Sequence, residues 1–188
     1  TKDGGNKLEG SMNIYSGDHV TNDPIFLNLD SYTPTNDYSI SASLNGPIIP
    51  GRLTFYSSGR INRSSGWLYG MQTFTMYGDT VFTDENNNGS MDEDEQTEPP
   101  SYKSMNWFRA WSTQNKLTLR ISPVTKFRLN SIINSSISQG YNHGRQMAQD
   151  GRKRHFNKGQ FSGLNLSHSF SAMSFIEINA SQYIHRNE

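Results

Sequence analysis

The sequence contains no cysteine, no excess of either charge and no long apolar run. Without cysteine the chain forms neither disulfides nor thiolate metal sites. Its 17 basic and 17 acidic side chains balance, whereas nucleic-acid-binding domains usually carry a clustered basic excess, so no nucleic-acid partner is expected. No stretch approaches 18 consecutive apolar residues, which argues against a transmembrane helix.

The residues that are present make the chain polar without making it charged. Ser and Asn supply 25 and 19 of the 188 residues, and only 18% of residues are charged. Aromatic residues reach 12%, more than a disordered chain usually carries. The length indicates one domain or a piece of a larger one. Because the chain opens at Thr1 without an initiator Met, we expect a fragment or a processed chain.

The dominant sequence period is two residues, which is typical of β-strands with one apolar and one polar face. The segment 53–62, for example, places Leu53, Phe55 and Ile61 on one face and Arg60 on the other. Seven segments alternate in this way: 8–15, 38–45, 53–62, 116–121, 128–134, 163–167 and 176–181. The sequence therefore predicts an all-β fold, an antiparallel up-and-down meander of about seven strands.

The connections between these segments alternate in length. Short turns are predicted at 46–51, 122–126 and 169–172, and long connections at about 18–36, 71–102 and 143–158. Long connections without secondary structure are uncommon in compact domains and usually functional. Since they fall at every second connection, all three are expected at one end of the meander.

Two architectures fit this pattern: a soluble sandwich or barrel with an apolar core, and a transmembrane β-barrel with its apolar face on lipid. The apolar faces include small residues such as Gly10, Ala42 and Gly59, which would fill a sandwich core thinly. The polar faces suit a water-filled interior. The membrane barrel is therefore favoured, although an open seven-stranded sheet would leave two unpaired edges in lipid. On that interpretation the chain is incomplete.

Two motifs resemble TonB-dependent outer-membrane receptors. Residues 1–11, Thr-Lys-Asp-Gly-Gly-Asn-Lys-Leu-Glu-Gly-Ser, resemble the junction between the plug of that family and its first barrel strand. Residues 45–49, Asn-Gly-Pro-Ile-Ile, followed by 52–56, Arg-Leu-Thr-Phe-Tyr, resemble the first periplasmic turn and the third strand. The rhythm of strands and loops then matches over the whole chain.

The resemblance implies a 22-stranded transmembrane β-barrel in the cell outer membrane, filled by an N-terminal plug. Residues 1–6 would end the plug, and residues 7–188 would form the N-terminal portion of the barrel. The implied function is TonB-energised uptake of a scarce nutrient such as a siderophore, glycan or peptide. The implied partners are the TonB complex through the missing N-terminal part, the transported molecule and outer-membrane lipids. The alternative is a soluble or surface-attached all-β module that binds its target in a calcium-dependent way.

The segment 84–95 fits the twelve-residue EF-hand calcium loop, with Gly89 at its bend. Calcium prefers six to eight oxygen ligands, and this spacing offers side-chain or backbone oxygens at the required positions. The candidate metal ligands are Asp84, Asn86, Asn88, Ser90, Asp92 and Glu95. The flanks do not look helical, so this would be a calcium loop outside a true EF-hand. A solvated acidic turn is the other interpretation.

Three further groups of residues are candidates for binding or for solvation alone. The first is a basic cluster in the connection 143–158, which either steers a charged ligand or is merely solvated. The second is a set of aromatics near the long-loop ends, expected as an outer aromatic girdle, with sugar-stacking platforms as the alternative. The third faces the barrel interior and either contacts the plug or is merely solvated on the barrel wall. The basic cluster consists of Arg145, Arg152, Lys153, Arg154 and Lys158. The aromatics are Trp67, Tyr69, Trp107, Phe108, Trp111 and Tyr141. The residues expected to face the interior are Glu9, Arg60, Arg120 and Arg128.

No motif supports catalysis, and the chain is not expected to be an enzyme. A Gly-x-Ser-x-Gly elbow, a phosphate-binding loop and a His-Glu-x-x-His sequence are all missing. His168 lies beside Ser167 and Ser169, but the alternation places His168 on the lipid side. His143 and His155 lack a carboxylate cluster, so we expect no metal site there.

Overall fold

The computed structural model describes residues 5–71, 102–148 and 151–188, and it shows an all-β protein. Within these residues, the regular structure consists of nine strands and one short 3-10 helix, η2 (His143–Arg145). The strands are β1 (Glu9–Gly17), β2 (Asp37–Ile49), β3 (Leu53–Ser64), β4 (Tyr69–Met71), β5 (Tyr102–Ser104), β6 (Trp107–Ser122), β7 (Thr125–Gln139), β8 (His155–Ser171) and β9 (Ser174–Asn187). In the described part of the chain, no helix has the length and hydropathy to span a membrane.

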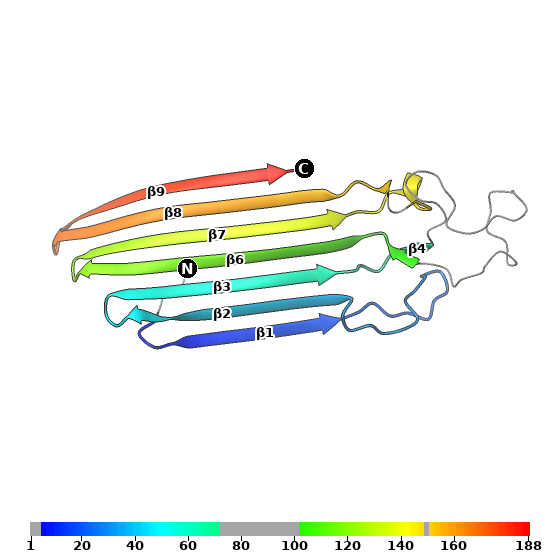
Figure 1. Cartoon of the computed structure of the whole chain (residues 1–188), viewed down its shortest axis with the longest axis horizontal. Coiled ribbons are helices and arrows are strands. Elements are labelled where there is room, and N and C mark those ends of the chain that lie inside the picture. The colour runs from blue at the N-terminus through cyan, green and yellow to red at the C-terminus, as the bar shows by residue number, and fades with distance from the viewer. Residues whose placement is uncertain (1–4, 72–101, 149–150) are drawn as a thin grey trace, which may run out of the picture.

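Seven of the strands form one antiparallel sheet in the order β1-β2-β3-β6-β7-β8-β9 (Figure 1). Each strand of this sheet pairs with the sheet strand that comes before it along the chain, so the sheet is a meander. The two short strands β4 and β5 form a separate hairpin within the connection between β3 and β6. The predicted all-β fold and the seven-stranded meander are confirmed, and each of the seven alternating segments lies in one strand of the sheet, except that Leu8 precedes β1.

All three short turns lie at one end of the sheet, and all three long connections lie at the other (Figure 1). The turns are tighter than predicted. The strands run on to residues 49, 122 and 171, so that only residues 50–52, 123–124 and 172–173 remain between them. The long connections cover 18–36, 65–106 and 140–154. The predicted loop 143–158 was therefore too long, since residues 155–158 belong to β8 and pair with β7.

The turn predicted at 46–51 begins too early, because Pro47 suggests the end of a strand although the strand continues to Ile49. Pro47 lies within β2 and pairs with Thr54 of β3. The pairing between β1 and β2 ends at Glu9 and Asn45, so β2 is an edge strand at Pro47. An edge strand tolerates proline because no neighbour needs its missing N–H group.

The pairing register separates the side chains of the sheet into two faces. One row runs across five strands through Phe55, Leu117, Leu129, Leu164 and Ala180. The row next to it, on the opposite face, runs through Thr54, Thr118, Arg128, Asn165 and Asn179. We call these the apolar face and the polar face. The alternation predicted in each segment is thus aligned across the whole sheet.

Burial in this sheet is the reverse of that in a soluble domain. The buried polar strand residues include Asn45, Lys116 and Asn165, which all lie on the polar face. Leu44, Leu117 and Leu164 are their neighbours on the apolar face, and all three are exposed. In the described part of the chain, the buried hydrophobic residues are Leu29 and Met105, which lie in long connections.

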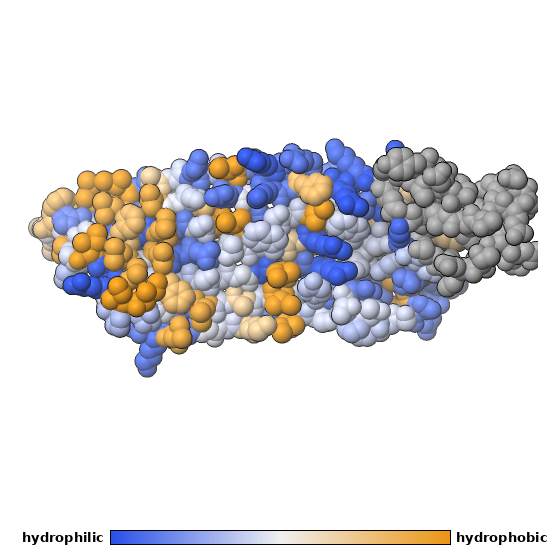
Figure 2. Space-filling view, viewed as in Figure 1, coloured by the Kyte–Doolittle hydropathy of each residue, from blue (hydrophilic) through white to orange (hydrophobic). Residues whose placement is uncertain are grey.

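The apolar face changes character along the strands. Apolar side chains gather toward the end that carries the short turns (Figure 2). The row through Leu117 is followed, toward the long connections, by a polar row of Ser57, Asn115, Ser131, Ser162 and Gln182. Ser57 Oγ donates a hydrogen bond to Asn115 Oδ1 at 2.8 Å within this row. The apolar band is therefore densest over the turn half of the sheet.

Candidate functional site

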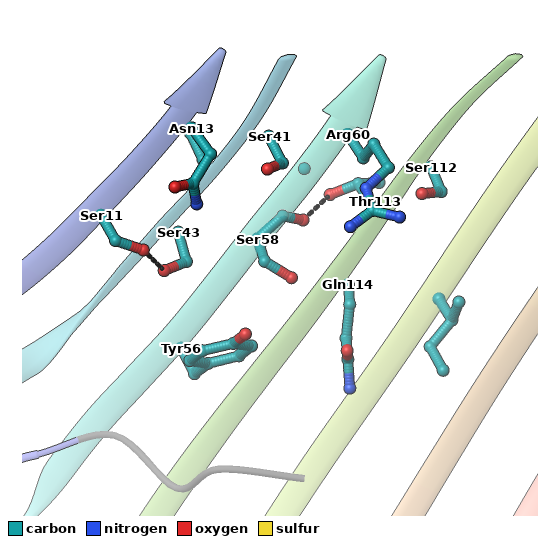
Figure 3. Close-up of a pocket in the computed structure, with 13 residues that line it drawn as sticks. Ser11, Asn13, Ser41, Ser43, Tyr56, Ser58, Arg60, Ser112, Thr113 and Gln114 are labelled. Carbon is teal, nitrogen blue, oxygen red and sulfur yellow. Dashed lines mark hydrogen bonds between the residues drawn. The ribbon is translucent and has the colours of Figure 1, made fainter. Parts of the chain in front are cut away.

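The polar face of the first strands carries a hollow of about 400 Å³ (Figure 3). Its wall is formed mainly by hydroxyl and amide side chains from β1, β2, β3 and β6, with one guanidinium and one phenol. The polar side chains labelled in the figure include Ser11, Asn13, Ser41, Ser43, Tyr56, Ser58, Arg60, Ser112 and Gln114. Their alternation with apolar residues along each strand brings them to one side.

The groups of this hollow are arranged to form hydrogen bonds with a polar partner. Ser11 Oγ and Ser43 Oγ lie 2.8 Å apart across β1 and β2, and Thr113 Oγ1 donates to the carbonyl oxygen of Ser58 at 3.1 Å. Arg60 adds a positive charge to the same wall. Hydroxyl and amide groups both donate and accept hydrogen bonds, so this surface suits a polar polypeptide or a hydroxyl-rich ligand.

The segment before β1 also meets the polar face. The backbone N–H of Gly5 donates to Asn45 Oδ1 at 3.2 Å, and Asn45 Nδ2 donates to the carbonyl oxygen of Glu9 at 3.3 Å. Asn45 is only 4% exposed. Next to it, a Cβ on Gly46 would lie 3.0 Å from the Cα of Leu8, so this approach requires glycine. The chain therefore enters the sheet from the polar side.

A second polar network lies on the same face over β7, β8 and β9. Arg128 Nη1 donates to Asn165 Oδ1 at 2.8 Å, and Asn165 Nδ2 donates to Glu177 Oε1 at 2.5 Å and to Asn179 Oδ1 at 2.6 Å. These bonds satisfy a buried amide on a face that also carries charge. The four residues predicted to face the interior, Glu9, Arg60, Arg120 and Arg128, all lie on the polar face.

At the loop end of the sheet, Arg152 joins two long connections. Its guanidinium donates to the carbonyl oxygens of Ser104 at 2.8 Å and Gly140 at 3.0 Å, and also to that of Met105. Gln139 Oε1 accepts from Trp107 Nε1 at 2.7 Å, while Gln139 Nε2 donates to the carbonyl oxygen of Arg152 at 3.1 Å. Arg152 is 5% exposed. It is thus an anchor rather than a solvated loop cation.

The three long connections share an apolar hollow of about 320 Å³. Leu27 comes from the first connection, Met71 and Met105 from the second, and Met147 from the third. Methionine is flexible and polarisable, so such a wall adapts to apolar groups of different shape. The hollow lies among the long connections, beyond the ends of the seven strands of the sheet.

Tyr69 of β4 lines this hollow and has an altered acidity. Burial raises the pKa of its phenol, and the carboxylates of Asp18 and Asp37 raise that pKa further. Those two carboxylates also organise the first connection and the start of the second. Asp18 accepts hydrogen bonds from the N–H of Thr33 at 2.7 Å and from Asn36 Nδ2 at 3.1 Å, and Asp37 accepts from the N–H of Ser65 at 2.8 Å. The phenol is therefore part of the folded loop region.

The six aromatics predicted as one outer girdle do not form one. Trp107 and Trp111 lie on the apolar face of β6, but Phe108, between them, lies on the polar face. Trp67 packs edge-on against Phe26, with ring centroids 6.0 Å apart, and Tyr141 lies in the connection after β7. A girdle of six would need all the side chains on one face, and the strand alternation prevents this.

The structure separates Ser167 from His168. Adjacent residues of β8 point to opposite faces: Ser167 is opposite Lys126 and Glu177, whereas His168 Nδ1 lies 2.7 Å from Thr125 Oγ1.

His143 lies 2.8 Å from the hydroxyl of Tyr141, and His155 begins β8. Over residues 5–71, 102–148 and 151–188 no three His, Cys, Asp or Glu side chains gather as metal ligands. The six predicted calcium ligands between Asp84 and Glu95 lie outside the described residues.

Comparison with known proteins found no match among protein-family models, curated proteins or solved structures.

Proposed function

We propose that this sheet is a section of a transmembrane β-barrel, with the apolar face on lipid and the polar face toward a wet interior. The observation that carries the proposal is the reversed burial. On β6, Lys116 is 7% exposed and the adjacent Leu117 is 38% exposed. A domain surrounded by water would be expected to bury the leucine side chain and to expose the lysine side chain. A lipid environment on one side and a polar interior on the other provides that reason.

The lengths of the strands and connections support the same arrangement. A strand tilted in a bilayer needs about 9–11 residues to cross the hydrocarbon. Strands β6 to β9 have 14 to 17 residues, enough to cross and to project beyond the membrane. Because apolar side chains concentrate at the short-turn end, we place that half in the hydrocarbon and the loop half outside it. Short turns of two or three residues on one side and long loops on the other are typical of outer-membrane barrels.

We further propose that the whole protein is a TonB-dependent uptake receptor. The hydrogen bond from Gly5 to Asn45 supports this, because it places Gly5, just before the first strand, on the polar face, where a plug inside the barrel would lie. The polar hollow around Arg60 would then contact the plug or the passing substrate. The apolar hollow shared by the three long connections would receive an apolar part of the substrate.

The first test is the size and location of the native protein. An antibody to residues 151–171 is used on fractionated cells of the source organism. We expect a band of roughly 100 kDa, the size required by a plug and 22 strands. It should sediment with outer membranes and resist alkaline extraction. A band near 21 kDa, the mass of this chain, in a soluble fraction would overturn the proposal.

A calcium-dependent soluble module is the alternative that the sequence leaves open. Such a module needs a layer that covers Leu117, Leu129 and Leu164, and the described residues place none on that face. Calcium binding itself is compatible with either architecture, and we retain it as a separate proposal. Isothermal titration of the purified full-length protein should show saturable calcium binding that the double variant Asp84→Asn/Glu95→Gln loses. Equal heats for both proteins would contradict a site at 84–95.

A further inference from the structure

On the loop half of the apolar face, two pairs of cations lie directly opposite each other on neighbouring strands. Arg63 pairs with Arg109 across β3 and β6, and Lys158 pairs with Arg186 across β8 and β9. Like charges in direct opposition destabilise a sheet unless something neutralises them. The ion pair found between described residues joins His19 and Asp37, and involves none of these four cations. The pairs therefore form a positive surface suited to an anion.

The first pair also lines a hollow with apolar walls. The hollow measures about 350 Å³, and its lining includes Arg63, Arg109, Tyr38, Trp111 and Ile137. The guanidinium of Arg109 lies 5.4 Å from the centre of the Trp107 ring, a cation–π contact that restrains the side chain. Trp111 remains 45% exposed. Cationic and aromatic groups on one wall suit a ligand that is both anionic and apolar.

The position of this hollow defines which ligand fits it. Trp111 and Leu117 lie on the same face of β6, six residues apart, or about 20 Å at a rise of about 3.3 Å per residue. A molecule with its charged head at Arg63 and Arg109 can therefore extend its apolar part over the band that begins at Leu117. Aromatic side chains commonly mark the level at which lipid headgroups meet protein.

We propose that this hollow binds the phosphorylated headgroup of an anionic lipid, whose acyl chains lie along the apolar face toward the short turns. Arginine presents a planar array of donors that matches phosphate oxygens in a bidentate way, and two opposed arginines can share one phosphate. Lys158 and Arg186 extend the positive surface across β8 and β9 for a second anionic group. This inference rests on the proposed membrane placement of the sheet.

The test uses the full-length protein purified in an uncharged detergent. Fluorescent phosphatidylglycerol in mixed micelles is the probe, with phosphatidylcholine and inorganic phosphate as competitors. The variant is Arg63→Gln/Arg109→Gln. The matched control is Arg120→Gln/Lys126→Gln, which removes a directly opposed cation pair from the polar face. Circular dichroism and the unfolding midpoint establish that each variant is folded.

We expect the Arg63 and Arg109 double variant to bind phosphatidylglycerol roughly tenfold to thirtyfold more weakly, as cations near an anionic lipid surface suggest. The control should bind as the unchanged protein does. Phosphatidylcholine and inorganic phosphate should compete poorly. Equal affinity of the two double variants would overturn the inference, and full displacement by inorganic phosphate would reduce the hollow to a simple anion site. Either failure in a protein that fractionates with outer membranes leaves the barrel proposal standing, whereas a soluble native protein removes the barrel proposal itself.

Discussion

The two faces of the sheet differ in the opposite sense from the faces of a soluble β-protein. Along β6, Lys116 and Thr118 are 7% and 6% exposed, whereas Leu117 and Leu119 are 38% and 37% exposed. All four residues belong to one strand, and the two polar residues face the opposite side of the sheet from the two leucines. On this strand the polar face is closed to solvent and the apolar face is left open.

This comparison shows that burial within the sheet is not driven by removal of apolar groups from water. Exposed apolar surface is costly in water, at about 25 cal/mol per Å², and soluble proteins rarely expose large contiguous apolar patches. The apolar face therefore requires a solvent or a partner other than water, and lipid supplies one. Substitutions that place the same side chain once on the apolar face and once on the polar face test this directly.

The largest effect is expected from a charge placed on the apolar band. Leu119→Arg, one row nearer the short turns than Leu117, should destabilise the folded protein by about 2–4 kcal/mol in lipid, the cost of a cation well inside a barrel's lipid face. Asn134→Arg is exposed on the polar face of β7, opposite the uncharged Ser112 and Gly159, and should change stability by less than about 1 kcal/mol. Denaturant unfolding of the full-length protein in lipid bilayers measures both. Equal costs at the two positions would contradict a lipid-facing apolar band.

The second effect tests whether the reversed burial extends to the loop end, where Arg152 is the buried group. Arg152→Ala leaves carbonyl oxygens of Ser104 and Gly140 without their donor, at a cost of roughly 2–3 kcal/mol. Hydrogen exchange should rise around residues 102–106 and 140–148 and stay unchanged in β7. Arg154→Ala removes an exposed cation two residues away and is the control. Unchanged exchange in the Arg152 variant would show that the anchor is dispensable.

A smaller effect locates the outer limit of the apolar band. Asn115→Leu replaces a residue of the polar row that crosses the apolar face and removes its hydrogen bond with Ser57. If this row lies in hydrocarbon, the gain from leucine should exceed that loss and raise stability by about 1 kcal/mol. Asn130→Leu on the polar face is the control and should not stabilise. A destabilised Asn115 variant would place the limit of the band on the turn side of this row.

The sequence predicted the strands and their faces because both depend on local alternation. It predicted their ends less well, since the ends depend on neighbours. Pro47 lies within a strand because β1 does not extend alongside it, and residues 155–158 are extended because they pair with β7. The strands β4 and β5 have three residues each, too few for a periodic signal.

The binding groups depend on contacts between distant residues. The sequence leaves Arg152 as either a ligand-steering or a merely solvated loop cation, yet its guanidinium is held by the carbonyl oxygen of Met105, 47 residues away in the sequence. The opposition of Arg63 and Arg109 depends on a register that is set across the connection 65–106. Sequence periodicity assigns such residues to a face but does not give their partners on the next strand.

The smallest effect concerns Tyr69, whose phenol tests how the loop region holds a partly buried polar group. Burial, followed by Asp18 and Asp37, raises the pKa of this phenol in the folded protein. At high pH the unfolded chain ionises first, near its ordinary pKa of about 10. The phenol's contribution to stability is therefore complete below that pH and is lost as pH rises through the folded pKa. Absorbance at 295 nm, compared with Tyr69→Phe, reports this titration. Asp18→Asn should move it to lower pH, and an unmoved titration would mean that this carboxylate does not act on the phenol.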